Sequence, residues 1–452
     1  MLRAILLVVI DCLRADHVSC YGYDRPTTPT LDALAERGVL WKNAYSTACW
    51  TKPAVASLFT GLYPTQHGAF QGIKRSRLRE SVTTDVLGDS HATLAEVLTR
   101  AGWRCGAFIN NAQLGEFTGL QRGFATYVPN AGQADRLIGR FSDWLEAGGG
   151  RPSFAYLHFL EAHWPYKPRR RHVAMFGGNR DTNKFRDYRA RDYARLRRAI
   201  VRGERALSDD ELRQMIQLYD GAIRRLDGKL KTILGRLREL GLGEDAAVIV
   251  TADHGEEFME HGRIGHGQSL LYDEVMHVPL VAHVPGGPRG VQRRELVSQV
   301  DLAETVASIA GLNGELPGQN LLDPVAKPRP VCAEMRIRHK YTQCIRTARW
   351  KLYRRYVLNC NDADARSSRS PRDLVGTCSY QLTHELYDMD ADPQEHVNMA
   401  EKPACAAARA GLEADLDQWW QGLPLRGNHR SPGEVQIDDA VVQRLRDLGY
   451  LD

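Results

Sequence analysis

The feature that most constrains the fold is the alternation of short apolar runs with helical patterns, from the N-terminus to about residue 311. The apolar runs, each bounded by turn residues, predict buried strands at 4–10, 105–109, 154–159, 246–251 and 279–284. Helical patterns that end at a glycine occupy 27–38, 91–102 and 301–311, and a capping box at 208–211 predicts a long amphipathic helix through Leu240. Such alternation predicts an α/β fold: a mostly parallel sheet covered by helices on both faces, with ligands bound at the carboxyl ends of its strands.

Beyond about residue 325 the pattern changes. Residues 339–358 suggest two short antiparallel strands, a polar stretch follows, and a helix is expected near 403–421, ahead of a terminal segment 438–452. We therefore expect a large α/β domain over 1–325, with a basic helical insertion at about 167–210, and a smaller C-terminal α+β subdomain over 326–452.

Composition and charge limit the class of protein. The 452-residue chain is 43% apolar and 25% charged, which is typical of a globular protein and argues against wholesale disorder. Its net charge of +5 is mild, but residues 167–205 hold far more Arg and Lys than Asp and Glu. This segment favours an anionic partner, for example as a lid over an anionic substrate. The alternatives are that it is a solvated basic helix or a disordered insertion. Nucleic acid is not specifically indicated.

Cysteine usage and the N-terminus bear on the compartment. The nine cysteines contain no CxxC pair, so neither a complete disulfide framework nor a zinc ribbon is indicated. The apolar run 4–10 is too short for a signal peptide, and no stretch approaches the roughly 20 apolar residues of a membrane span. We expect a cytoplasmic protein without a membrane partner; the sequence does not indicate its oligomeric state.

Acidic and histidine side chains follow several of the predicted strands. The candidates are Asp11, Glu161, His163, Asp253, His254 and His266. Carboxylates and imidazoles that converge from strand ends are ligands of Zn²⁺, Mn²⁺ or another divalent ion, Ca²⁺ and Mg²⁺ included. Each residue alone is also explained as a polar cap on a strand or turn, but their common position at one sheet edge favours one or two bound ions.

Thr51 opens a further helical pattern, "TKPAVASLFTG". A hydroxyl at a helix N-terminus faces free N–H groups and the positive end of the helix dipole, where an anionic ester can dock. Threonine is also a common N-cap, and the two interpretations are compatible because a nucleophile can serve as the cap.

Five blocks of sequence resemble, in order, those of the sulfatase branch of the alkaline phosphatase superfamily. They are "DCLRADHVSCYGYDRPTTPTLDALAERGVLWKNAYS", "SLFTGLYPTQHG", "TADHGEEFMEHGRIGHG", "LYDEVMHVPL" and "ELYDMDADPQEHVNMA". The resemblance implies that family's fold, a central sheet between helices with a small C-terminal sheet. It also implies metal-assisted attack by an activated side chain, followed by hydrolysis of the covalent intermediate.

The chain departs from the sulfatase pattern at the nucleophile. Where sulfatases carry Cys-x-Pro-x-Arg, or Ser for Cys, this chain has Thr51, Pro53 and Val55, and threonine cannot become formylglycine. Cys49 lies two residues too early. Further departures are Cys12 for the second Asp after the first strand, Asn111 and Gln113 for a Lys and a His, and His266 for a Lys. Thr51 therefore resembles the direct nucleophile of the phosphodiesterase and phosphatase branches.

These residues suggest roles in a reaction. The expected ligands of the first ion are Asp11, Asp253, His254 and the hydroxyl of Thr51. The side chains expected to hold a second ion, or to act as general acid and base, are His163 and His266, with Glu161. Asn111 is expected to donate to a non-bridging oxygen of the substrate.

The sequence thus predicts a metal-dependent hydrolase of phosphate mono- or diesters, or of phosphonate esters, on a small or glycan-linked anionic substrate. Two other activities stay open: hydrolysis of sulfate esters without formylglycine, and transfer of a phospho-group to an acceptor. A non-catalytic protein that kept the fold is disfavoured by the intact set of Asp11, Thr51, Asp253 and His254.

Overall fold

A computed structural model of the chain centres on an eight-stranded sheet of order β12-β2-β11-β8-β1-β7-β5-β6. It describes residues 2–71, 74–75, 81–267, 271–325, 328–337, 339–360, 371–424, 433–436 and 443. The strands of this sheet are β1 (Ala4–Ile10), β2 (Val39–Tyr45), β5 (Arg104–Ile109), β6 (Thr126–Val128), β7 (Ser153–Phe159), β8 (Ala246–Thr251), β11 (His277–His283) and β12 (Val291–Ser298). All five predicted strands are present.

The centre of the sheet is buried on both faces. All seven residues of β1 are buried, and β1 pairs in parallel with β7 on one side and β8 on the other. Only β11 runs antiparallel to its neighbours β2 and β8. The prediction of a mostly parallel sheet is therefore confirmed.

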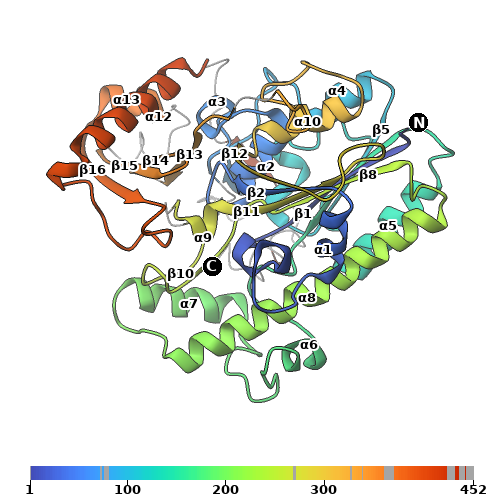
Figure 1. Cartoon of the computed structure of the whole chain (residues 1–452), viewed down its shortest axis with the longest axis horizontal. Coiled ribbons are helices and arrows are strands. Elements are labelled where there is room, and N and C mark those ends of the chain that lie inside the picture. Colours follow the sequence, from blue (N-terminus) through green and yellow to red (C-terminus); the bar gives the residue numbers. More distant parts are fainter. Residues whose placement is uncertain are drawn as a thin grey trace.

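Helices cover both faces of the sheet (Figure 1). On one face lie α1 (Pro29–Glu36), α5 (Ala134–Glu146) and α8 (Asp209–Glu239), and on the other lie α2 (Thr51–Thr60), α4 (Leu94–Arg100) and α10 (Asp301–Ile309). The predicted capping box opens α8: Ser208 Oγ accepts from the Glu211 N–H at 3.2 Å. None of the described helices combines the length and the apolarity that crossing a bilayer requires.

Helix α2, which carries Thr51 as its first residue, is fixed firmly in place. All ten of its residues are buried. It ends at Gly61, whose φ of 69° is left-handed and where a Cβ would lie 2.2 Å from the carbonyl oxygen of Pro317. Only glycine fits there, so the helix ends at a defined point and its first turn is held against the sheet.

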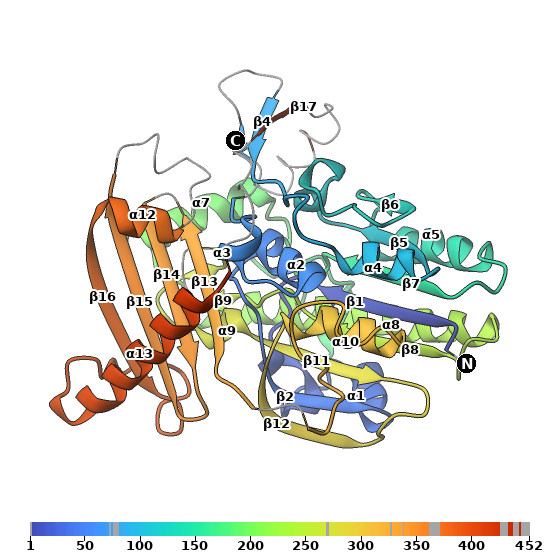
Figure 2. The same ribbon diagram turned by 90° about the horizontal axis from the view of Figure 1, so that it is seen from above.

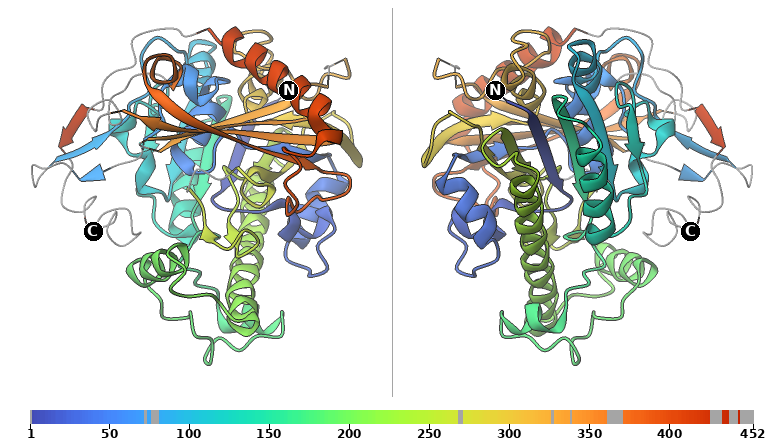
Figure 3. Two further views of the ribbon diagram at one scale, coloured as in Figure 1. Left: turned by 90° about the vertical axis from the view of Figure 1, so that its left-hand side faces the viewer. Right: turned by 90° about the vertical axis from the view of Figure 1, so that its right-hand side faces the viewer.

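The C-terminal part forms a four-stranded antiparallel sheet, β13-β14-β15-β16. Its strands are β13 (Val331–Ile337), β14 (Lys340–Arg346), β15 (Trp350–Asn359) and β16 (Ser379–Asp388), and helices α12 (Pro371–Thr377) and α13 (Ala406–Gly422) pack on it (Figure 3). The two strands predicted from 339–358 are β14 and β15, whereas β13 and β16 were not predicted. The predicted terminal segment 438–452 lies, apart from residue 443, outside the described residues.

Shorter elements complete the described chain. They are α3 (Pro64–His67), α6 (Arg170–Ala174), α7 (Ala190–Val201), α9 (Asp273–Met276), β3 (Lys74–Arg75), β4 (Ser81–Thr84), β9 (Glu257–Phe258), β10 (Ile264–Gly265), β17 (Gly433–Gln436) and the 3-10 turns 15–17, 19–21, 112–114, 116–118 and 403–405. In Figure 2, β1 runs from the labelled N-terminus toward the C-terminal sheet, so the carboxyl ends of the parallel strands face that sheet.

A buried ionic network joins the two sheets. The ammonium of Lys351 on β15, fully buried, donates to Asp273 at the start of α9 and, at 3.1 Å, to Glu395. Tyr353 also donates to Glu395, at 2.6 Å, and to the carbonyl oxygen of Leu271 at 2.7 Å. Lys351 is the cation that the buried Glu395 and the partly buried Asp273 share, so the junction depends on it.

We predict that Lys351→Met lowers the free energy of unfolding by about 3–5 kcal/mol, because the buried Glu395 and the partly buried Asp273 lose their shared counter-ion. Urea unfolding of the two proteins measures the difference. Lys231→Met is the matched control, since Lys231 is exposed on α8, and it should change stability little. Equal stability of the Lys351 variant and wild type would show that the network contributes nothing.

Candidate active site

Four side chains meet at the carboxyl edge of the large sheet. Asp11 follows β1, Asp253 and His254 follow β8, and Thr51 opens α2; none is more than 1% exposed. Thr51 Oγ1 lies 3.5 Å from Asp11 Oδ2 and 3.5 Å from His254 Nε2. His254 Nε2 lies 3.5 Å from Asp253 Oδ2 and 3.8 Å from Asp11 Oδ1. We call these four residues the threonine centre.

Asn111, just after β5, contacts two members of the centre. Its Nδ2 donates to Asp11 Oδ2 at 2.6 Å and to Thr51 Oγ1 at 3.3 Å. Its Oδ1 accepts from the N–H of Gln113 at 2.9 Å, which fixes the orientation of the amide. Asn111 thus presents a donor beside the Thr51 hydroxyl.

His158 is a further neighbour of Asp11 that the sequence analysis did not single out. It lies on β7 opposite Val9 of β1, and its Nε2 is 3.2 Å from Asp11 Oδ2. The hydroxyl of Tyr156 lies 2.8 Å from Nδ1, an arrangement that suits an Nε2–H donating to the carboxylate. The available signal was a histidine inside an otherwise apolar buried strand, a position that rarely holds a polar residue without a partner.

The threonine centre has the donor set and the spacing of a divalent metal site. Its recorded spacings of 3.5 to 3.8 Å are close to the edge of a tetrahedron whose metal–ligand bonds are about 2.1 Å. Asp253 Oδ2 is buried and has no hydrogen-bond partner in the described part of the chain. His254 Nδ1 lies 2.8 Å from the carbonyl oxygen of Gly255, which directs the Nε2 lone pair toward the centre. The residues therefore fit a bound cation.

The two carboxylates of the centre differ in proton affinity. Burial opposes ionisation of Asp11, but the hydrogen bond with His158 and the charges of His163 and His254 hold its pKa well below the usual range. Burial, together with the negative charge of Asp11, raises the pKa of Asp253. Without a cation the pair therefore holds a proton, which a metal ion must displace.

His163 and His266 lie beside the centre, whereas Glu161 does not. The His266 ring is 5.0 Å from the His163 ring and 4.4 Å from the His254 ring, between centroids. Burial, with His254 and His163 nearby, lowers the pKa of His266 and favours the neutral imidazole. Glu161 Oε1 instead accepts from the N–H of Ala134 at 2.6 Å, at the N-terminus of α5. It lies outside the metal-ligating groups found among the described residues.

The basic segment after His163 contains two helices, α6 and α7, and α7 packs against the loops of both histidines. Arg197 of α7 donates to the carbonyl oxygen of His266 at 2.9 Å, and Tyr193 of α7 stacks on Trp164 with centroids 4.4 Å apart. A Cβ at Gly265 would lie 2.2 Å from the Tyr193 hydroxyl, so α7 fits closely over this turn. This part of the segment positions the site from outside.

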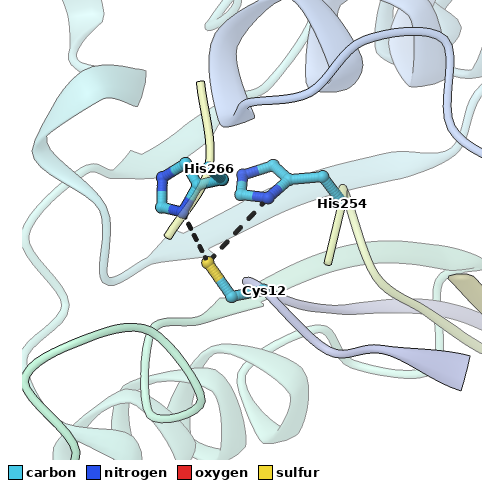
Figure 4. Close-up of side chains that lie close together, drawn as sticks. All are labelled: Cys12, His254 and His266. Carbon is cyan, nitrogen blue, oxygen red and sulfur yellow. Dashed lines mark hydrogen bonds between the residues drawn. The ribbon is translucent and has the colours of Figure 1, made fainter. Parts of the chain in front are cut away.

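Cys12 and Glu256 also face this region, and the sequence analysis assigned neither of them a role in the site. Cys12 Sγ is 3.2 Å from Asp11 Oδ1 and 3.4 Å from His266 Nδ1. Figure 4 shows the thiol directed at the imidazoles of His254 and His266. Glu256 Oε1 lies 3.4 Å from the same nitrogen of His266. A lone cysteine and a glutamate in a polar turn gave no signal in the sequence that would separate them from structural residues.

Comparison with known proteins identifies the family. The sulfatase family model matches residues 3–312. PehA of Trinickia caryophylli, described as a multifunctional alkaline phosphatase superfamily protein, is 26% identical, over 90% of this chain and 92% of its own length. Arylsulfatase A of Homo sapiens is also 26% identical, over 87% of this chain and 83% of its own length.

The fold is shared with solved structures. A phosphonate monoester hydrolase of Agrobacterium radiobacter superposes with a TM-score of 0.71 at 20% identity, over 96% of this chain and 100% of the hydrolase. Since the sulfatase model also matches well over half of the sequence, this chain belongs to the sulfatase family of the alkaline phosphatase superfamily, a family of sulfate and phosphate ester hydrolases.

Proposed function

We propose that this protein is a metal-dependent hydrolase of phosphate esters that uses Thr51 as its nucleophile. The observation that carries the proposal is the buried Thr51 hydroxyl at the N-terminus of α2, 3.5 Å from both Asp11 Oδ2 and His254 Nε2. When bound to the threonine centre, a divalent ion such as Zn²⁺ or Mn²⁺ lowers the pKa of a hydroxyl and neutralises charge on the ester.

The surroundings of Thr51 favour phosphate over sulfate esters. Within the described chain, its side-chain hydrogen-bond neighbours are Asp11, Asn111 and His254, with no Lys or Arg among them. The adjacent Lys52 turns away and donates to the carbonyl oxygen of Gln71 at 3.1 Å. The family's formylglycine and its neighbouring cations thus have no counterpart here. Cys49, the alternative nucleophile, packs in an apolar cluster away from the centre.

Residues of this chain supply the nucleophile, the hydrogen-bond donor to the ester and the general acid and base. The Thr51 hydroxyl loses its proton to solvent, and its oxygen then forms the bond to phosphorus as the bond to the leaving oxygen breaks. The Asn111 amide donates to a non-bridging oxygen. The imidazole of His163, in its protonated form, gives a proton to the leaving oxygen. In the second half the same imidazole takes a proton from the water that releases Thr51.

A cavity beside His163 suits the rest of the substrate. It encloses about 910 Å³ and is lined in part by Asn110, Arg136, Glu161, Lys167 and Arg225. The full lining holds three cationic side chains against the two carboxylates of Asp135 and Glu161, and this positive balance supports an anionic substrate, either small or attached to a glycan.

We predict that Thr51→Ala lowers phosphoester turnover at least about 10³-fold, since the nucleophile is removed while the fold stays intact. Matched nitrophenyl phosphate, phosphodiester, phosphonate and sulfate esters provide the assay. Thr60→Ala is the control, because Thr60 is equally buried on the same helix but donates only to the Ala56 carbonyl. Sulfate turnover that survives in Thr51→Ala would contradict the proposal and favour the alternative, a sulfatase without formylglycine.

We also predict that a chelator abolishes turnover and that binding of Zn²⁺ to the metal-free protein at pH 7 releases protons. The reason is the raised pKa of Asp253, whose proton the ion must displace. Calorimetric titration in buffers of different ionisation enthalpy measures the release.

Asp253→Asn should release about one proton fewer per chain than the wild type, because the Asp253 proton is then absent. Asp227→Asn should release as many as the wild type, since Asp227 is a buried carboxylate on α8 whose pKa is likewise raised by burial, but it binds backbone N–H groups outside the site. Zinc binding without any proton release would contradict the assignment of Asp253 as a ligand.

A further inference from the structure

The backbone at Cys12 holds its thiol in a defined direction. Its φ of 62° lies in the left-handed region, which residues other than glycine seldom adopt. The Cys12 N–H donates to Asp253 Oδ1 at 3.4 Å, and its carbonyl oxygen accepts from the Tyr219 hydroxyl at 2.7 Å. Strained backbone that is fixed in this way commonly serves a site.

A thiol and a carboxylate both lie at the spacing of metal ligands from His266 Nδ1. Cys12 Sγ and Glu256 Oε1 each lie 3.4 Å from His266 Nδ1, and Sγ lies 3.2 Å from Asp11 Oδ1. Neighbouring ligands on one tetrahedral Zn²⁺ are about 3.3–3.6 Å apart, given bonds of about 2.3 Å to sulfur and about 2.0–2.1 Å to nitrogen or oxygen. A further group, Asp11, Cys12 and His163, has its ligand atoms within 4.8 Å of one another.

Glu256 supplies independent evidence for a cation at this point. The side chain is fully buried, and its Oε2 accepts from the Tyr166 hydroxyl. Its Oε1 has no hydrogen-bond partner among the described residues, although it faces His266. A buried carboxylate oxygen without a donor is costly, and a metal ion at this oxygen would remove that cost.

We propose that Cys12, Glu256 and His266 form a second metal site, which we call the thiolate site, next to the threonine centre. A thiolate, an imidazole and a carboxylate suit Zn²⁺ or Co²⁺ better than Mg²⁺ or Ca²⁺. The inference deepens the proposed function, since it places a second positive charge beside Thr51, but its test does not depend on turnover.

The test is titration of the metal-free full-length protein with Co²⁺, followed by absorption spectroscopy and metal analysis. We expect two ions per chain and a near-ultraviolet charge-transfer band from thiolate to cobalt. Binding of Co²⁺ without that band would overturn the proposal, and the wild-type protein alone suffices for this result. One ion with the band would keep the thiolate site and count against the threonine centre.

Variants then assign the band to a residue. Cys12→Ser should lose both the band and the second ion, and Glu256→Gln should weaken the second ion at least about 10-fold. Cys105→Ser is the matched control, because Cys105 is a buried cysteine on β5 that contacts the Ala95 carbonyl, and it should keep both. A band that persists in Cys12→Ser would refute the assignment.

Cys12→Asp tests whether Cys12→Ser loses the band and the second ion merely because that variant fails to fold. It should again bind two ions, without the band and with affinity shifted toward Mn²⁺ and Mg²⁺. Failure of this proposal is distinct from failure of the proposed function: Thr51→Ala should retain the Cys12 band in full while it loses phosphoester turnover.

Discussion

The buried carboxylate of Asp11 is the constraint on which the centre of this molecule depends. A charge with no exposed surface is tolerated only when groups around it donate to it. Donors reach it from β7, from the loop after β5 and from the start of α2, in the form of His158, Asn111 and Thr51. The order β8-β1-β7-β5 makes this arrangement possible, because it sets the carboxyl ends of these strands side by side around β1.

The sequence predicted the continuous apolar strands well but missed several strands that carry charged side chains, and the reason is physical. A parallel strand covered on both faces is a continuous apolar run, as in 4–10 and 246–251. Strand β12, at the edge of the large sheet, alternates between partly buried and exposed residues and carries Arg293 and Arg294, so it resembles a loop. Strand β16 is largely exposed over its first half and was missed for the same reason. The long helix α8 was found because its capping box and its apolar stripe agree.

For the site, sequence position identified the residues that directly follow buried strands but could not tell where a side chain points. Asp11, Asp253 and His254 do converge, with Thr51 opposite them. Glu161 also follows a strand, yet it turns to the N-terminus of α5, where free N–H groups attract a carboxylate. Cys12 turns inward because of a single positive φ, and no pattern of residue types reveals such a torsion. His158 was hidden because it sits within a strand rather than after one.

The junction between the two sheets limits how the C-terminal sheet can be exchanged between proteins of this architecture. Lys351 belongs to the C-terminal sheet, whereas Asp273 lies on the short helix that follows the His254 and His266 loops, and Glu395 accepts from both the lysine and the backbone of Asp273. A chimera that grafts the C-terminal sheet of a relative onto this α/β layer must bring a matching cation, or it leaves the buried Glu395 and the partly buried Asp273 without a counter-ion. Lys351, Asp273 and Glu395 are therefore exchangeable only as a set, and the C-terminal sheet has to be exchanged together with the loops that carry His254 and His266.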